Sequence, residues 1–157
     1  MRVILGIATT LVLSATGLAA EEIAPRDGWW VQPTTKDFET LVDAVAEATK
    51  ANGMAVVTQA GPTGAAAKRG ITIPGNRVIG IFNNDFAVKI LETSTAAMIE
   101  APVRMYVTEN ADGTATLSYK MPSHVFAPYA DEGGDTLVQL ASELDAKFVS
   151  IADQAVN

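Results

Sequence analysis

The chain contains no cysteine among its 157 residues and only one histidine. The absence of cysteine excludes disulfide bonds, thiolate metal sites, c-type haem attachment and cysteine nucleophiles. Positive charge is also scarce, because 11 lysines and arginines stand against 18 acidic residues and give a formal net charge of −7. An acidic chain without a basic stripe repels phosphate backbones, so we expect no binding of nucleic acid.

Catalytic motifs are equally scarce. No serine lies in a Gly-x-Ser-x-Gly sequence, and the histidine belongs to no motif that would activate a nucleophile. The sequence Gly61-Pro62-Thr63-Gly64, followed by Lys68, has the wrong spacing for a phosphate-binding loop. We therefore expect that the protein is not an enzyme, and a hydrolase or isomerase without a recognisable motif is the alternative.

The N-terminus has the composition of a targeting segment. Arg2 precedes an apolar run from Val3 to Leu13, and small residues predominate from there to Ala20. This order is typical of a secretory signal peptide, so we expect residues 1–20 to be removed by cleavage near Ala19 or Ala20. The mature protein would then be periplasmic or secreted. An uncleaved anchor is the alternative, but a membrane-spanning helix needs about 20 strongly apolar residues and this run is shorter.

Residues 21–157 have the length of one domain and contain no repeat or interdomain linker. Nothing in them is long and apolar enough to span a bilayer, so we expect no stable membrane insertion after cleavage. Since disulfides are excluded, a hydrophobic core must hold this domain together, and a chain of this length can supply one.

Long helical patterns alternate with short strand patterns. We expect helices over about 35–52, 63–69, 85–99 and 136–155, and strands over about 54–59, 77–82, 103–109 and 114–121. Thr34 or Thr35 is the expected cap of the first helix. Asp112-Gly113, between the last two strands, is a strong hairpin signal. The pattern predicts an α+β fold in which helices pack on one face of a small antiparallel or mixed sheet.

Trp29 and Trp30 are adjacent in a short polar and aromatic segment that precedes the first helix. Neighbouring side chains on a strand point to opposite faces. We therefore expect one indole to pack inward and the other to lie at a surface or interface.

A set of turn and strand-end residues recurs in a recognisable order: Gly53, Phe82, Asn84, Pro102, Asp112-Gly113, Ser118-Tyr119 and Pro122. In this order, the run from Asn52 to Pro122 resembles the domain of unknown function 302 family. Where that family favours Gly and Pro, this chain has Asn83 and Asp85, and Asn83 can still adopt the left-handed conformation that a glycine would supply. The resemblance implies a compact α+β fold and a homodimer, and it brings no established activity.

Two places are candidates for ligand binding. Asn83 and Asn84 stand at the start of an expected helix, whose free backbone amides can hold an anion or a small polar ligand, although such residues also serve as simple caps. Tyr119 begins an aromatic segment that ends at Tyr129. This segment is expected to be a dimer contact first, a packed loop second and the wall of a pocket third.

His124, with Met121 three residues before it, is the candidate metal site. An imidazole and a thioether can ligate copper(I) or provide an axial ligand of haem. Against this, methionines commonly fill cores, and one histidine with scattered methionines is a thin ligand set. The leading hypothesis is therefore a non-enzymatic small-ligand binding or accessory protein without a cofactor, and the second is a haem or copper protein.

Overall fold

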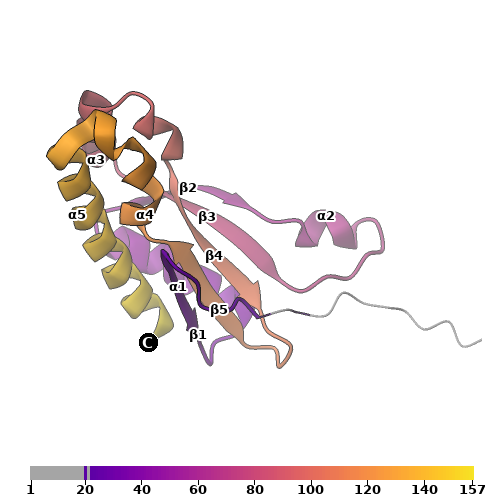
Figure 1. The fold of residues 1–157 in the computed structure, drawn as a ribbon. Helices are drawn as coiled ribbons and strands as arrows, with labels where there is room; N and C mark the ends of the chain where they lie inside the picture. The colour runs from indigo at the N-terminus through magenta and orange to yellow at the C-terminus, as the bar shows by residue number, and fades with distance from the viewer. Residues whose placement is uncertain (1–19, 21) are drawn as a thin grey trace, which may run out of the picture.

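The computed structural model describes Ala20 and residues 22–157, so the predicted signal peptide, apart from Ala20, lies outside the described residues. Its centre is an antiparallel sheet of 5 strands in the order β1-β5-β4-β3-β2 (Figure 1). The strands are β1 Trp29–Pro33, β2 Ala55–Ala60, β3 Asn76–Phe82, β4 Val103–Glu109 and β5 Ala115–Lys120. The expected α+β fold is confirmed, with the antiparallel form of the sheet.

Helices cover one face of this sheet (Figure 1). The helical elements are α1 Phe38–Ala51, α2 Thr63–Ala67, α3 Asn84–Thr93, η1 Ala97–Glu100, α4 Pro122–Phe126, η2 Ala127–Tyr129 and α5 Ala130–Val156. α1 and α5 contact each other along the sheet, whereas the segment that carries α2 extends away from them (Figure 1). None of the helices in the described part of the chain has the length and apolar composition needed to cross a membrane.

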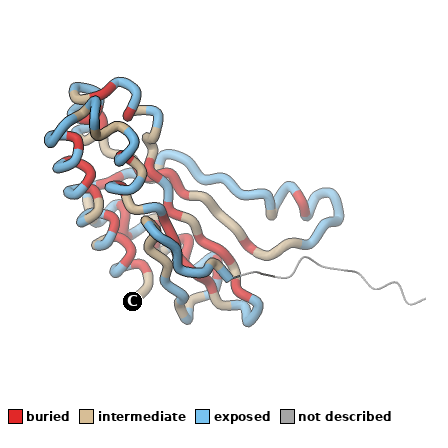
Figure 2. Tube along the Cα trace, viewed as in Figure 1, coloured by how far each residue is buried: buried red, intermediate tan, exposed pale blue. Residues whose placement is uncertain are grey.

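The hydrophobic core lies between the sheet and α1, α3 and α5 (Figure 2). Alternate residues of the central strands point into it, as the two-residue period of a strand requires. These residues are Ile79, Ile81, Met105, Val107, Leu117 and Tyr119, each at most 2% exposed. The residues between them in each strand point the other way, to the face of the sheet that no helix covers.

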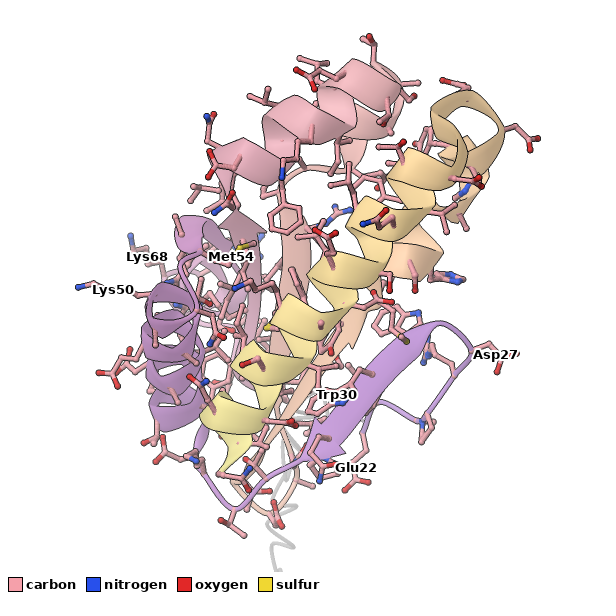
Figure 3. The ribbon with its side chains drawn as sticks, turned by 90° about the vertical axis from the view of Figure 1, so that its left-hand side faces the viewer. Glu22, Asp27, Trp30, Lys50, Met54 and Lys68 are labelled. Carbon is pink, nitrogen blue, oxygen red and sulfur yellow. The ribbon has the colours of Figure 1, made fainter. Side chains whose placement is uncertain are left out.

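The first strand, β1, forms one edge of the sheet and pairs with β5 from Trp29↔Lys120 to Pro33↔Thr116. Trp30 stacks on Tyr119 with a centroid distance of 5.4 Å and packs against the core, between β1 and α5 (Figure 3). Trp29 points to the opposite face. The expectation that one indole packs inward and the other lies at a surface is therefore confirmed.

Several helix ends differ from the sequence expectation. α1 begins at Phe38, because Asp37 rather than Thr34 or Thr35 caps it, with Oδ1 accepting from the Thr40 amide at 3.0 Å. The expected helix over 85–99 is interrupted at Ser94, whose backbone is extended. The last helix begins six residues earlier than expected and kinks at Gly134, where φ is 58°.

Candidate functional site

The face of the sheet that no helix covers carries aromatic and cationic side chains in register. Trp29 of β1 pairs with Lys120 of β5, and Tyr106 of β4 lies between Ser118 and Val78. Since cross-strand partners point to the same side of a sheet, these side chains share one face. Their placement follows from the strand period and the register alone.

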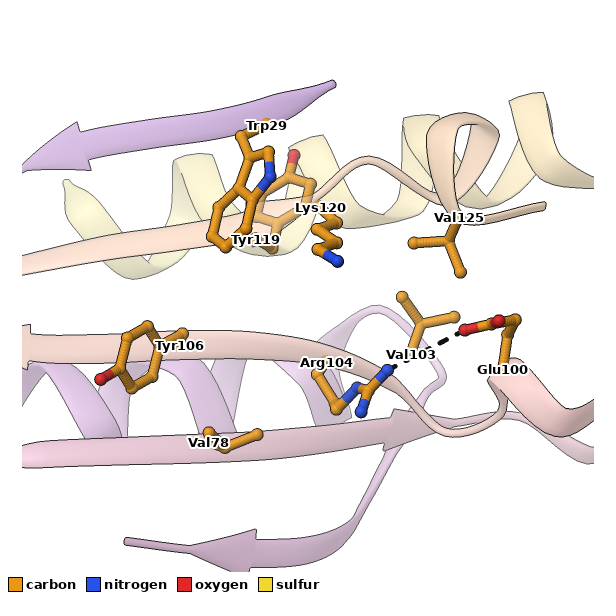
Figure 4. Close-up of a pocket in the computed structure, with 9 residues that line it drawn as sticks. All are labelled: Trp29, Val78, Glu100, Val103, Arg104, Tyr106, Tyr119, Lys120 and Val125. Carbon is orange, nitrogen blue, oxygen red and sulfur yellow. Dashed lines mark ion pairs between the residues drawn. The ribbon is translucent and has the colours of Figure 1, made fainter. Parts of the chain in front are cut away.

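A groove of about 290 Å³ opens on this face, near the start of β4 and the end of β5 (Figure 4). Strands β1, β3, β4 and β5 contribute to it, together with η1 and α4. The residues around it are Trp29, Val78, Glu100, Val103, Arg104, Tyr106, Tyr119, Lys120 and Val125. The groove is therefore assembled from segments that are far apart in the sequence.

Aromatic and β-branched side chains form the walls of this groove. Trp29 and Tyr106 are half-buried, and Val78, Val103 and Val125 complete the apolar surface. Cations lie beside the indole: Lys120 Nζ is 5.8 Å, and the guanidinium carbon of Arg26 is 5.1 Å, from the centroid of the Trp29 ring. Both distances lie within the range of about 6 Å in which a cation and an aromatic face attract each other.

On the charged side of the groove, an ion pair and a hydrogen bond meet at Glu100. Arg104 Nη2 lies 3.9 Å from Glu100 Oε2, and the Tyr129 hydroxyl donates to Glu100 Oε1 at 2.8 Å. The same hydrogen bond raises the pKa of the Tyr129 hydroxyl, because its donated proton stabilises the neutral form. Lys120 forms no ion pair with any residue that the structure describes. Glu100 is thus shared by Arg104 and Tyr129, and Lys120 is left exposed beside the indole.

Gly28 fixes the position of Trp29. Its φ of 74° is in the left-handed region that favours glycine. Its carbonyl accepts from the Met121 amide at 2.9 Å, and the following Trp29 amide donates to Arg26 at 3.1 Å. A Cβ at position 28 would overlap the imidazole of His124. The turn before β1 is therefore packed directly against the start of α4.

The candidate metal residues, Met121 and His124, lie one turn apart at the start of α4, and the His124 amide donates to the Met121 carbonyl at 2.9 Å. The Met121 side chain packs against the core, whereas His124 is exposed and covers Gly28. Within the described residues, no group of three or more His, Asp or Glu side chains is arranged to hold a metal ion. The haem or copper hypothesis stays a prediction.

Asn83 and Asn84 lie at the turn from β3 to α3. Asn83 caps the helix, with Oδ1 accepting from the amides of Asp85 at 2.9 Å and Phe86 at 3.2 Å, while Nδ2 donates to the Gly53 carbonyl at 3.0 Å. Asn84 is exposed. Neither residue borders the groove, and the hollow beside Asn83 measures only about 20 Å³.

Tyr119 is the one predicted ligand-binding residue that borders the groove. Its ring nevertheless belongs to the core, where the residue is 1% exposed and the hydroxyl has no hydrogen-bond partner. Phe126, in the same predicted aromatic interface, is 2% exposed. These two rings pack within the chain, and the dimer contact expected of this segment stays a prediction.

Sequence reasoning missed Arg104, Tyr106 and Lys120. The signal was present in the hairpin, because Val103, Met105 and Val107 alternate with Arg104 and Tyr106. Pairing the strands about the Asp112-Gly113 turn sets Met105 opposite Tyr119, so the next residues, Arg104 and Lys120, point to the other face of the sheet. Arg104 and Lys120 therefore lie on neighbouring strands, on the face opposite the apolar residues of β4. This pair of cations would have indicated the groove.

Comparisons with known proteins place the chain among uncharacterised relatives. The family model described as "Domain of unknown function DUF302" matches residues 30–155. A crystal structure of an uncharacterized conserved protein DUF302 from Bacillus stearothermophilus superimposes with a TM-score of 0.73 at 14% sequence identity, covering 83% of this chain and 99% of that one. At this identity the likeness extends to the fold alone. No curated protein matches the chain.

Proposed function

The chain belongs to the DUF302 family, a domain of unknown function, and on that premise we propose that it is a non-enzymatic protein that binds a small molecule in the groove on the uncovered face of its sheet. The observation that carries this proposal is the groove itself: a concave surface with apolar walls and a few charged groups. Small-molecule sites have this composition, in which apolar walls supply contact area and isolated polar groups orient the ligand.

The size of the groove supports a small ligand. Its volume of about 290 Å³ lies just below the range of roughly 300–1,000 Å³ for ligand sites. The groove also lies over well-packed strands, since Met105 and Leu117 on the opposite face of β4 and β5 are fully buried. A site built on strands whose other face is packed keeps its shape without a ligand, which lowers the entropic cost of binding.

We also propose that the protein acts outside the cytoplasm, after removal of residues 1–20. The support is the sequence order of a positive start, an apolar run and small residues. The ligand would then be a molecule of the periplasm or of the surroundings of the cell.

The proposal is tested by screening a library of small fragments against the ¹⁵N-labelled mature protein by NMR. We expect amide shifts from bound fragments to cluster at β4, at the end of β5 and at Trp29. Val78→Trp, which fills the groove from β3, should abolish these shifts. The matched control is Val88→Trp, which adds the same bulk to the exposed face of α3, where Val88 is 47% exposed. Shifts that cluster elsewhere, or that persist in Val78→Trp, would overturn the proposal.

A further inference from the structure

We infer that the groove selects a small aromatic carboxylate, with Lys120 as the partner of the carboxylate and Trp29 as the partner of the ring. This inference rests on the proposed binding function and names the class of ligand. It follows from three features of the groove: its local charge, the presence at its border of Lys120, which has no acidic neighbour among the described residues, and the distance from Lys120 Nζ to the aromatic wall.

The local charge is opposite to that of the whole molecule. The chain has a formal net charge of −7, yet the charged residues that border the groove are Arg104, Lys120 and Glu100, and Arg26 lies beside Trp29. Cations therefore outnumber carboxylates at this site. In an acidic protein, such a reversal attracts anions to one place and leaves the rest of the surface repulsive to them.

Glu100 offsets Arg104 and leaves Lys120 uncompensated. Both Glu100 oxygens are engaged, one by the Tyr129 hydroxyl and the other by Arg104. Lys120 has no carboxylate in ion-pair range among the described residues. Figure 4 shows its side chain directed into the space between β5 and Arg104. A ligand carboxylate placed there would form a charge-assisted hydrogen bond with the ammonium group.

The aromatic wall stands within reach of the same ammonium group. Lys120 Nζ is 5.8 Å from the centroid of the Trp29 ring, so a carboxylate hydrogen-bonded to the ammonium group lies close enough to the indole for an attached ring to contact it. A ligand whose carboxylate binds Lys120 therefore brings its ring against Trp29. Val103 and Val125 border the remaining space with apolar surface, which favours a flat hydrocarbon ring over a hydrated one.

The test compares three probes that share one ring system by isothermal titration calorimetry: 2-naphthoate, uncharged 2-naphthamide and cationic 2-naphthylmethylammonium. We expect 2-naphthoate to bind with a Kd at least tenfold below that of 2-naphthamide, and the cation to bind most weakly. Raising the salt concentration should weaken only the binding of 2-naphthoate appreciably, because salt screens the charge interaction.

Two lysine variants assign the selectivity to its residue. Lys120→Gln should reduce the preference for 2-naphthoate over 2-naphthamide to less than threefold. Lys89→Gln, at an exposed position of α3 outside the groove, removes the same charge and should leave the preference unchanged. A preference that survives in Lys120→Gln, or that is lost in Lys89→Gln, would overturn the role of Lys120.

The outcomes separate this inference from the proposed function. If 2-naphthamide binds as tightly as 2-naphthoate, and both shift the amides of the groove in NMR spectra, the ligand class is wrong while the binding function stands. If none of the three probes binds and the fragment screen also finds no ligand in the groove, the binding function itself fails.

Discussion

The Tyr119 hydroxyl is buried without a hydrogen-bond partner, at a residue that is 1% exposed. An unsatisfied buried polar group costs about 1–3 kcal/mol of desolvation free energy. We therefore expect Tyr119→Phe, which keeps the stacking on Trp30, to raise the free energy of unfolding by about 1 kcal/mol. Urea denaturation followed by circular dichroism measures this change. A loss of stability would show that the hydroxyl makes a favourable contact.

The same hydroxyl predicts a loss of stability in alkali. Burial, followed by the negative charges of Asp145 and Asp153, raises the pKa of Tyr119 above its ordinary value. Between the unfolded pKa of about 10 and the higher folded value, the folded state holds more protons than the unfolded state, so stability falls as pH rises. We expect the free energy of unfolding to decrease above about pH 10 and to decrease less steeply in Tyr119→Phe. Tyr129, whose pKa is also raised by its hydrogen bond to Glu100, contributes to the slope that the variant retains.

Gly28 is the residue on which the position of Trp29 depends. We expect Gly28→Ala to lower the free energy of unfolding by at least about 1–2 kcal/mol, because its φ of 74° strains any L-residue and the new Cβ overlaps His124. The ligand affinity of the groove should fall as well. The double variant Gly28→Ala/His124→Ala should recover part of the stability, since it removes the overlap but not the strain. Additive effects of the two substitutions would contradict this packing.

The placement of single residues was only partly predictable from the sequence. The opposite orientations of Trp29 and Trp30 follow from the strand period. The separation of Asn83 from Tyr119 does not, because it depends on which strands are neighbours in the sheet. Met121 and His124 are close in sequence, but the helix start directs one side chain to the core and the other to solvent.

At the scale of elements, local signals predicted α1, β3 and the β4–β5 hairpin well, because apolar periodicity and an Asp-Gly turn define them. The short α4, with Pro122 at its first position, was missed. It begins directly after β5, without the apolar periodicity or the capping side chain that marks longer helices. The interruption after α3 was missed as well. Ser94 donates to Glu132 of α5, a tertiary contact that no local pattern reveals, and its Oγ accepts from the Ala97 amide at the start of η1.

The start of α3 provides a prediction at this scale. We expect Asn83→Ala to lower the free energy of unfolding by about 1 kcal/mol, because it removes the side-chain cap of the helix and the bond to the Gly53 carbonyl. Asn83→Asp keeps the capping oxygen and should lose less. Asn84→Ala is the matched control, because that exposed side chain caps nothing, and it should change stability by less than about 0.5 kcal/mol. Thermal unfolding of the three variants gives the ranking.

At the scale of the whole molecule, the sequence predicts that the first residues are absent from the working protein. We expect mass spectrometry of the protein recovered from the periplasm or medium to show an N-terminus at Ala20 or Glu21. Leu11→Arg together with Leu13→Arg breaks the apolar run and should leave the full-length chain inside the cell. An intact Met1 on exported wild-type protein would contradict cleavage.

The overall class of fold was accessible from the sequence because helices and strands alternate in it with clear periods. The groove was not, since it exists only after the sheet order β1-β5-β4-β3-β2 has brought the first and last strands together. Local sequence patterns do not predict the order of the strands in the sheet.

That pairing of the first strand with the last has a kinetic consequence. β1 is the first strand of the chain and its partner β5 is the last, so the three other strands lie between them in the sequence. Contacts so distant in sequence close slowly, because the entropy of the intervening loop must be lost before they form. We therefore expect β1 to dock last in folding. The folding chain would present an open edge at β5 until then, and Trp29 would complete the groove in the final step.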